Sequence, residues 1–171
     1  FYMDMEQNLE VDQYDNPIGL RQRNDFYSGK YIHRGSHLIL KNSKNQILLQ
    51  KRSKNKTWDP DKFNYAAGGT ISNETYEECI IRETEEEIGI KVNVKELFKI
   101  KYFSKNDKAF HKIFIAYSDE KITCEKDEIQ FVKWFEEDFL KKDILENPDN
   151  YTPVFIIGMK KFFKIDEWAE K

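Results

Sequence analysis

Short apolar runs separated by polar, turn-rich segments predict a chain built largely on β-strands. Residues 36–53, SHLILKNSKNQILLQKRS, hold two apolar runs around a polar stretch at residues 42–45, which is typical of a β-hairpin. Three later segments have the same strand-like character: ELFKIKYF, AFHKIFIAYS and IQFVKWF, at residues 96–103, 109–118 and 129–135. We therefore expect a sheet that takes strands from both halves of the chain.

Two further segments are rich in turn-forming residues. Residues 9–23, LEVDQYDNPIGLRQR, predict two short strands joined by a turn at Asp15, Asn16 and Pro17. Residues 54–69, KNKTWDPDKFNYAAGG, are rich in Asp, Asn and Pro, and they predict a loop.

The clearest helical pattern follows this loop. Thr75 and Glu78 have the spacing of a capping box, and Gly89 marks the end of the run. A shorter helix is expected over EEDFLKKDIL, residues 136–145, and a last one from Thr152-Pro153 through VFIIGMKKFF. Strands on both sides of a helix, followed by helices near the C-terminus, predict an α/β fold, a sandwich in which helices cover a mixed sheet.

Composition fits one domain over residues 1–171, of which residues 1–30 form an N-terminal strand extension. The chain is 39% hydrophobic, enough for a core, and its net charge of −3 argues against a nucleic-acid polymer as partner. No apolar run reaches the roughly 18 residues of a membrane span, so no membrane partner is expected. Cys79 and Cys124 have no familiar disulfide spacing, which favours a reduced, cytoplasmic setting.

The predicted helix after Thr75 carries an unusual concentration of acid. At about 100° per residue, Glu83, Glu86 and Glu87 share one narrow face without a lysine. An apolar face for the core is expected beside it, formed by Ile80, Ile81, Thr84 and Ile88. The outer side carries Glu78, Arg82 and Glu85. A solvated charged face is one interpretation, and the other is a site for Mg²⁺ or Mn²⁺, since hard divalent cations prefer clustered carboxylates.

The segment GGTISNETYEECIIRETEEEIGI resembles the signature of the Nudix hydrolases. The signature positions are a glycine, a glutamate, an Arg-Glu pair, a Glu-Glu pair, a second glycine and an aliphatic residue. In this chain they fall on Gly68, Glu74, Arg82-Glu83, Glu86-Glu87, Gly89 and Ile90. Thr84 departs from the pattern, where the family prefers Leu or Ala, and we interpret it as a packing variation.

This resemblance implies a fold, a cofactor and roles for individual residues. The fold is the Nudix-type α/β/α sandwich with a mixed sheet, in which the signature over residues 68–90 forms a loop, a helix and a loop. By the family pattern, Glu83, Glu86 and Glu87 bind Mg²⁺ or Mn²⁺, with the carbonyl of Gly68 as a further ligand. Arg82 orients the neighbouring carboxylates, and Glu74 lies near the site.

A second likeness covers most of the chain. The stretches VDQYDNPIG, YIHRGSHLIL and ILLQKRSKNKTWDPDKF resemble the isopentenyl-diphosphate isomerase-like branch of the Nudix superfamily. In the isomerase, the residues that match Arg52 and Lys56 hold the substrate diphosphate, and the one that matches His33 helps to bind a metal. The resemblance makes Arg52, Lys56 and His33 candidate substrate-binding residues. Trp58 is a candidate for stacking on a ring, although an aromatic side chain that covers the edge of the sheet is the favoured interpretation.

The isomerase's own catalytic groups are missing. Alanines at Ala66 and Ala67 stand where the isomerase has its cysteine region, and His111 and Lys112 stand where its later glutamate is expected. We therefore expect hydrolysis, catalysed by Glu86 and Glu87. Glu128 is a candidate further ligand or general base. His111 is a candidate base near neutral pH.

The residues and the two resemblances leave three functions open. The leading one is a Mg²⁺- or Mn²⁺-dependent hydrolase that cleaves a diphosphate linkage in a small molecule, such as a nucleotide. An isomerase-like activity on an isoprenoid diphosphate is the second, and a non-catalytic Nudix module that senses a nucleotide is the third. The family also makes a homodimer possible.

Overall fold

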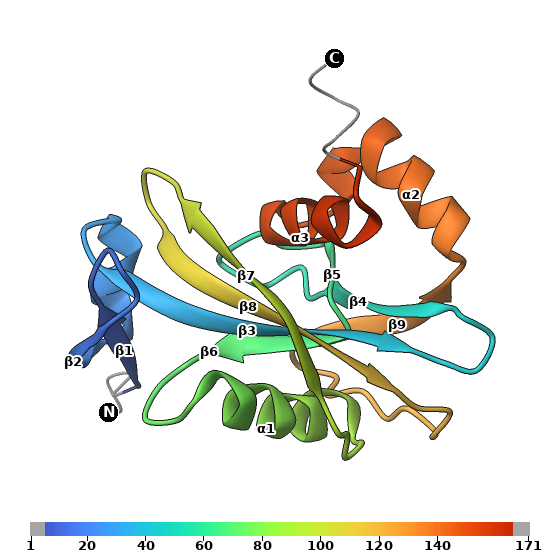
Figure 1. The fold of residues 1–171 in the computed structure, drawn as a ribbon, viewed down its shortest axis with the longest axis horizontal. Coiled ribbons are helices and arrows are strands. Elements are labelled where there is room, and N and C mark those ends of the chain that lie inside the picture. The colour runs from blue at the N-terminus through green and yellow to red at the C-terminus, as the bar shows by residue number, and fades with distance from the viewer. Residues whose placement is uncertain (1–5, 166–171) are drawn as a thin grey trace.

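A mixed sheet of nine strands forms the centre of the computed structural model, which describes residues 6–165 (Figure 1). The strands are β1 Gln7–Val11, β2 Pro17–Gln22, β3 Ile32–Lys41, β4 Ile47–Arg52, β5 Phe63–Asn64, β6 Ala67–Thr70, β7 Lys95–Phe103, β8 Lys108–Tyr117 and β9 Ile129–Phe135. The helices are α1 Tyr76–Ile88, α2 Glu137–Glu146 and α3 Pro153–Phe163, with 3₁₀ turns η1 Arg23–Ser28 and η2 Pro148–Asn150.

Strand β3 organises the sheet. Along one edge it pairs in parallel with β8, from Ile32↔Lys108 to Lys41↔Tyr117. Along its length it also meets β1, β6 and β4, each in antiparallel orientation. Strand β4 pairs with β3 for only two residue pairs and then with β5, while β9 pairs with β4 along its whole length. The sheet therefore divides beyond the β3–β4 turn, and this division is where the site forms.

The helices cover both faces of the sheet (Figure 1). Helix α1 packs on one face over Leu38, Leu48 and Phe114, and helices α2 and α3 pack on the other over Ile39, Leu49 and Ile113. Successive residues of β3 and β4 point to opposite faces, so each strand feeds both cores. The predicted α/β/α sandwich with a mixed sheet is confirmed.

The local signals identified in the sequence explain how the elements begin and end. Thr75 accepts a hydrogen bond from the Glu78 backbone N–H at 3.1 Å while the Glu78 carboxylate accepts one from the Thr75 N–H at 3.0 Å, which is the predicted capping box. Gly89 ends α1 in the left-handed conformation, with φ 73°. In the N-terminal hairpin, Asp12 Oδ1 accepts from the N–H groups of Tyr14 and Asn16 and closes the turn before β2.

Two expectations were wrong. Residues 54–69 are not a continuous loop, because they contain β5 and β6, whose ladders are completed by β4 and β3. Pairing with a neighbouring strand overrides the low strand propensity of glycine. Ile81 is 37% exposed, whereas Ile80, Thr84 and Ile88 are fully buried, so the core face of α1 is narrower than predicted. Thr84 does face the core, where its hydroxyl donates to the Ile80 carbonyl at 2.6 Å.

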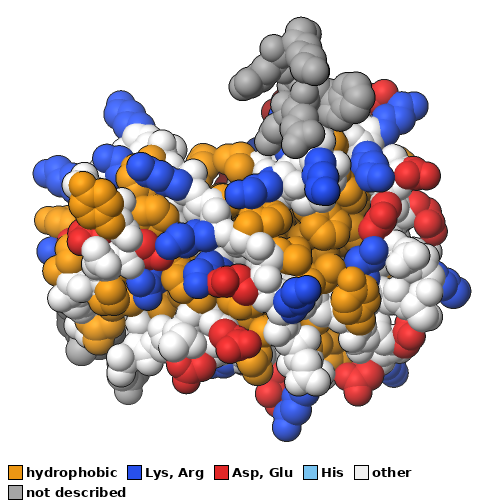
Figure 2. Space-filling model, in the orientation of Figure 1, with side chains coloured by type: hydrophobic (Ala, Val, Ile, Leu, Met, Phe, Trp, Pro, Cys, Tyr) orange, Lys and Arg blue, Asp and Glu red, His pale blue; other side chains and the backbone are white. Residues whose placement is uncertain are grey.

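Basic and acidic side chains are intermixed on the face shown in Figure 2, in keeping with the small net charge. Within residues 6–165, no helix has both the length and the apolar character needed to cross a membrane.

Gly158 allows α3 to approach the sheet closely. A Cβ at this position would lie 1.9 Å from the hydroxyl oxygen of buried Tyr65, which donates to the Val154 carbonyl at 3.1 Å. We expect Gly158→Ala to lower the free energy of unfolding by about 1–3 kcal/mol, as overpacked cores do, despite the better helix propensity of alanine. Urea unfolding would measure this. Gly19→Ala is the matched control, since a Cβ there meets nothing within 4 Å. Equal stability of the two variants would contradict the prediction.

Candidate active site

Glu87 occupies the division of the sheet between β4 and β6. It projects from the last turn of α1 and is only 6% exposed. Its Oε1 accepts from Gln50 Nε2 at 2.8 Å, and its Oε2 accepts from the Gly68 backbone N–H at 3.3 Å. Gln50 also donates to the Ala66 carbonyl at 3.1 Å. These bonds satisfy a buried carboxylate and fix its position against both strands.

Glu83 lies one helical turn before Glu87, against the second glycine of β6. A Cβ on Gly69 would lie 2.5 Å from the Glu83 carboxyl carbon, so the strand approaches the carboxylate only because this residue is glycine. Burial raises the pKa of both carboxyls, and that of Glu87 well above its usual range. For Glu87, the charge of neighbouring Glu83 adds to this effect. Two carboxyl groups thus lie side by side in a largely buried position.

Arg82 binds three carboxylates of the signature. It forms a two-pronged pair with Glu74, Nη2–Oε1 at 2.6 Å and Nε–Oε2 at 3.0 Å. Its Nη1 reaches Glu83 Oε1 at 3.0 Å and Glu86 Oε2 at 3.1 Å. Glu86 differs from its neighbours because its side chain is 58% exposed. The arginine therefore contacts three signature carboxylates, and its orienting role stays a prediction.

The donor set has the chemistry expected for a hard divalent cation. Carboxylate oxygens are the ligands Mg²⁺ and Mn²⁺ prefer, and the carboxyl groups of Glu83 and Glu87 lie next to each other. Glu83, Glu86 and Glu87 do not converge on one point. Over residues 6–165, no three His, Cys, Asp or Glu side chains lie close enough together to hold a metal. Glu83 and Glu87 meet, while Glu86 turns toward Arg82.

The two basic residues predicted to bind substrate lie at the end of β4 and in the loop after it, and Arg52 is close enough to Glu87 to feel its charge. Arg52 donates from Nε to the Asp59 carbonyl at 3.1 Å and from Nη2 to the Trp58 carbonyl at 2.8 Å. Burial lowers the pKa of Arg52, although the charges of Asp59, Glu87 and Glu128 oppose that shift. Lys56 Nζ lies 3.4 Å from Glu128 Oε2. The structure therefore brings Arg52, Lys56 and Glu128 together, with Glu128 as the partner of a lysine.

Sequence reasoning missed a cluster formed by the chain's three histidines. His33 and His37 project from β3 on the α3 side of the sheet, and His111 joins them from β8, in register with Gly35. His37 Nε2 lies 2.9 Å from His111 Nδ1. Gly35 and Gly68 make room for the rings, since a Cβ on either would lie 2.5 Å from a ring nitrogen. The four-residue spacing of His33 and His37 in one strand was the available signal, because it places both on one face.

This cluster changes the interpretation of two histidines. Burial holds the pKa of His111 well below its usual range, which argues against its acting as a base near neutral pH, and that role stays a prediction. His33 Nε2 lies 2.7 Å from Asp107 Oδ1, and its ring packs edge-on against Phe26 at 5.3 Å. These contacts give His33 a structural role, and its contact with substrate stays a prediction.

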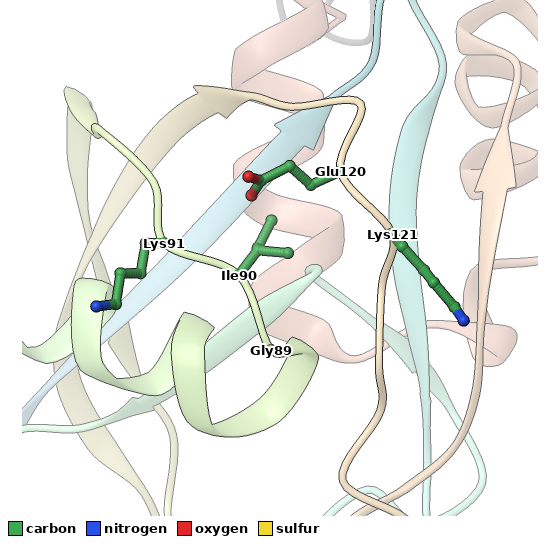
Figure 3. A pocket seen from close by; sticks show the side chains of 5 residues that line it. All are labelled: Gly89, Ile90, Lys91, Glu120 and Lys121. Carbon is green, nitrogen blue, oxygen red and sulfur yellow. The ribbon is translucent and has the colours of Figure 1, made fainter.

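Two surface cavities lie away from the acidic face. One, of about 480 Å³, is lined by Gly89, Ile90 and Lys91 after α1 and by Glu120 and Lys121 of the loop after β8 (Figure 3). The other, of about 640 Å³, lies between the N-terminal hairpin and the start of α1, where its lining includes Asp15, Arg34 and Tyr76. Neither lining contains Glu83, Glu86 or Glu87.

A helix whose acidic face meets a glycine-containing strand is the arrangement that the Nudix resemblance predicts. The NUDIX domain family matches residues 32–155, and this chain belongs to that family. It is a Nudix hydrolase, a pyrophosphohydrolase.

Individual relatives refine this assignment. The chain is 45% identical over 166 residues to a prenyl-diphosphate phosphatase of Methanosarcina mazei, with 95% of this chain and 96% of that protein covered. It is 28% identical to an isopentenyl-diphosphate Delta-isomerase of Photorhabdus laumondii, covering 92% and 94% of the two chains. The crystal structure of DR0079 from Deinococcus radiodurans has the same fold, with a TM-score of 0.72 at 24% identity, and covers 83% of this chain and 90% of that one.

The buried histidines predict how stability depends on pH. Burial, reinforced by the charge of Arg52, lowers the pKa of His37 to about 3, against about 6.5 in the unfolded chain. The unfolded chain therefore binds more protons between these values, so the stability due to neutral His37 is complete above pH 6.5 and is lost as pH falls toward 3. The loss can reach about 1.4 kcal/mol per pH unit.

Urea unfolding between pH 7 and pH 4.5 measures how steeply the free energy of unfolding falls with pH. We expect a shallower slope in His37→Gln than in the wild type, because glutamine does not titrate. Superimposable slopes for the two proteins would show that His37 is not held neutral by the fold.

Proposed function

We propose that this chain hydrolyses a prenyl diphosphate, with Mg²⁺ or Mn²⁺ as cofactor, at the face formed by Glu83, Glu86 and Glu87. The observation that carries the proposal is the 45% identity to a prenyl-diphosphate phosphatase over nearly the full length of both chains. The sequence alone favoured a nucleotide as substrate. This relative favours a prenyl group in its place.

Arg52 and Lys56 are the residues proposed to receive the diphosphate. The carbonyls of Trp58 and Asp59 bind two N–H groups of Arg52 and orient the guanidinium. Lys56 is paired with Glu128 at 3.4 Å, and the Glu128 side chain is 54% exposed. An exposed pair of this kind is weak, so a diphosphate oxygen can replace Glu128 as the partner of Lys56 with little loss of free energy.

Glu83, Glu86, Glu87 and the Gly68 carbonyl are the proposed metal ligands. A divalent cation bound there would neutralise the diphosphate oxygens and stabilise the charge that develops as a phosphorus–oxygen bond breaks. Arg82 holds Glu74, Glu83 and Glu86 in fixed positions before the cation arrives. Glu87 is also proposed to take a proton from the attacking water. Glu128 is the alternative base.

The structure argues against isomerase chemistry, which needs a thiol at the site. Ala66 and Ala67 are buried and carry no reactive group. Cys79 is fully buried in α1, where its Sγ lies 3.7 Å from the Gly69 carbonyl, and burial raises the pKa of its thiol. It therefore stays protonated and out of reach of substrate.

A substrate panel tests the proposal. Purified protein with Mg²⁺ or Mn²⁺ is incubated with farnesyl diphosphate, isopentenyl diphosphate, a nucleoside diphosphate and a nucleotide sugar, and release of phosphate or pyrophosphate is measured. We expect turnover of farnesyl diphosphate that EDTA abolishes and added Mg²⁺ restores. Turnover of the nucleotide substrates alone would overturn the prenyl assignment, and an isomerised product without phosphate release would favour the isomerase.

Substitutions in α1 test the acidic face. Glu86→Gln and Glu87→Gln should each lower kcat at least about a hundredfold, the scale of losing a group that stabilises the transition state. Glu85→Gln is the matched control, because its side chain points outward and lies 4.0 Å from Lys91. Loss of activity in all three variants alike would mean that charge on the helix matters in general, rather than this one face.

A further inference from the structure

An N-terminal extension lies outside the family match yet is firmly attached to the domain. The NUDIX match begins at residue 32, whereas β1, β2 and η1 span Gln7 to Ser28. Asp15, in the turn of the hairpin, anchors the extension: its carboxylate accepts from Arg34 Nε at 2.6 Å, Lys99 Nζ at 2.9 Å and the Tyr76 hydroxyl at 2.8 Å. This side chain is 5% exposed. The extension is therefore held as a fixed part of the fold.

The end of the extension presents an aromatic ring beside the β4–β5 loop. Phe26 in η1 is 2% exposed and packs against His33, which fixes the neighbouring residue Tyr27. The rings of Tyr27 and Trp58 lie 5.5 Å apart, and Arg23 Nε donates to the Tyr27 hydroxyl at 3.1 Å. Both rings remain partly open to solvent, at 37% and 40%. We call Tyr27 and Trp58 the aromatic pair.

The aromatic pair is continuous with the proposed diphosphate site. The Trp58 carbonyl accepts from Arg52 Nη2 at 2.8 Å, so the loop that carries the apolar ring is bonded to the cation at the end of β4. A prenyl diphosphate has a charged head joined directly to a long apolar tail. A protein that binds both ends needs an apolar surface next to its diphosphate cations, and exposed aromatic rings supply it.

Two relatives match the N-terminal extension as well as the Nudix domain. The prenyl-diphosphate phosphatase covers 95% of this chain and the isopentenyl-diphosphate isomerase 92%, which leave about nine and about fourteen residues unmatched. Each alignment must therefore include part of the extension, whereas the general NUDIX match excludes it. Both relatives carry an isoprenoid diphosphate in their names.

We infer that the aromatic pair is the binding surface for the prenyl tail, with Tyr27 supplied by the N-terminal extension and Trp58 by the Nudix domain. This inference rests on the proposed function and goes beyond it, because it assigns recognition of the tail to two named residues. The length of the tail should then matter to binding, while the chemistry at α1 should not depend on the pair.

Kinetics with long and short substrates test the inference. Tyr27→Ala and Trp58→Ala should each raise the KM for farnesyl diphosphate about tenfold, in line with losing the burial of part of an apolar tail, with kcat retained. The KM for isopentenyl diphosphate, whose tail is a single isoprene unit, should change less than about twofold. Trp58→Phe should restore most of the loss. Tyr117→Ala is the matched control, since Tyr117 is a 68% exposed aromatic at the end of β8.

A direct binding measurement separates this inference from the proposed function. Titration calorimetry with farnesyl diphosphate in EDTA reports binding without turnover, and the alanine variants should weaken it about tenfold. If the wild type hydrolyses farnesyl diphosphate but the variants bind and turn it over normally, the inference fails and the function stands. If binding depends on the pair without hydrolysis, the inference stands and the function fails. Equal losses on both substrates would mean that the pair acts through Arg52, and would overturn the inference.

Discussion

The structure depends on the burial of one carboxylate between a helix and a divided sheet. Glu87 is brought from α1 into the space between β4 and β6, and Gln50 and the Gly68 N–H supply the hydrogen bonds that make its burial tolerable. Because these partners come from two strands, the carboxylate links α1 to both β4 and β6.

The two faces of the sheet accommodate different side chains near Glu87. On the α1 side, Gly69 admits Glu83, and Arg82 gathers the remaining signature carboxylates. On the α3 side, Gly68 admits the ring of His37, which stacks near Tyr65 at 4.8 Å. Neighbouring glycines on one strand thus serve opposite faces, because successive Cβ positions alternate across a sheet. A side chain at either position would displace a group of the site.

Local patterns in the sequence were sufficient for much of the fold. The capping box at Thr75, the stop at Gly89 and the strand over residues 129–135 depend on neighbours in the chain, and they were predicted correctly. Strand β6 was missed because its pairing comes from β3, some thirty residues earlier. The signature grouped three glutamates on one face, but it could not show that Glu87 is buried while Glu86 is exposed. That difference arises from Gln50 and β6, which no helical pattern contains.

The hydrogen bonds of Asp15 couple the N-terminal hairpin to the assembly of the rest of the domain. Its three hydrogen-bond donors come from β3, β7 and α1, so the carboxylate is fully bound only when these three elements are assembled around it. Any opening that separates them releases the hairpin as well. Amide hydrogen exchange in β1 and β2 should therefore follow the cooperative opening of the domain rather than the fraying usual near a chain end.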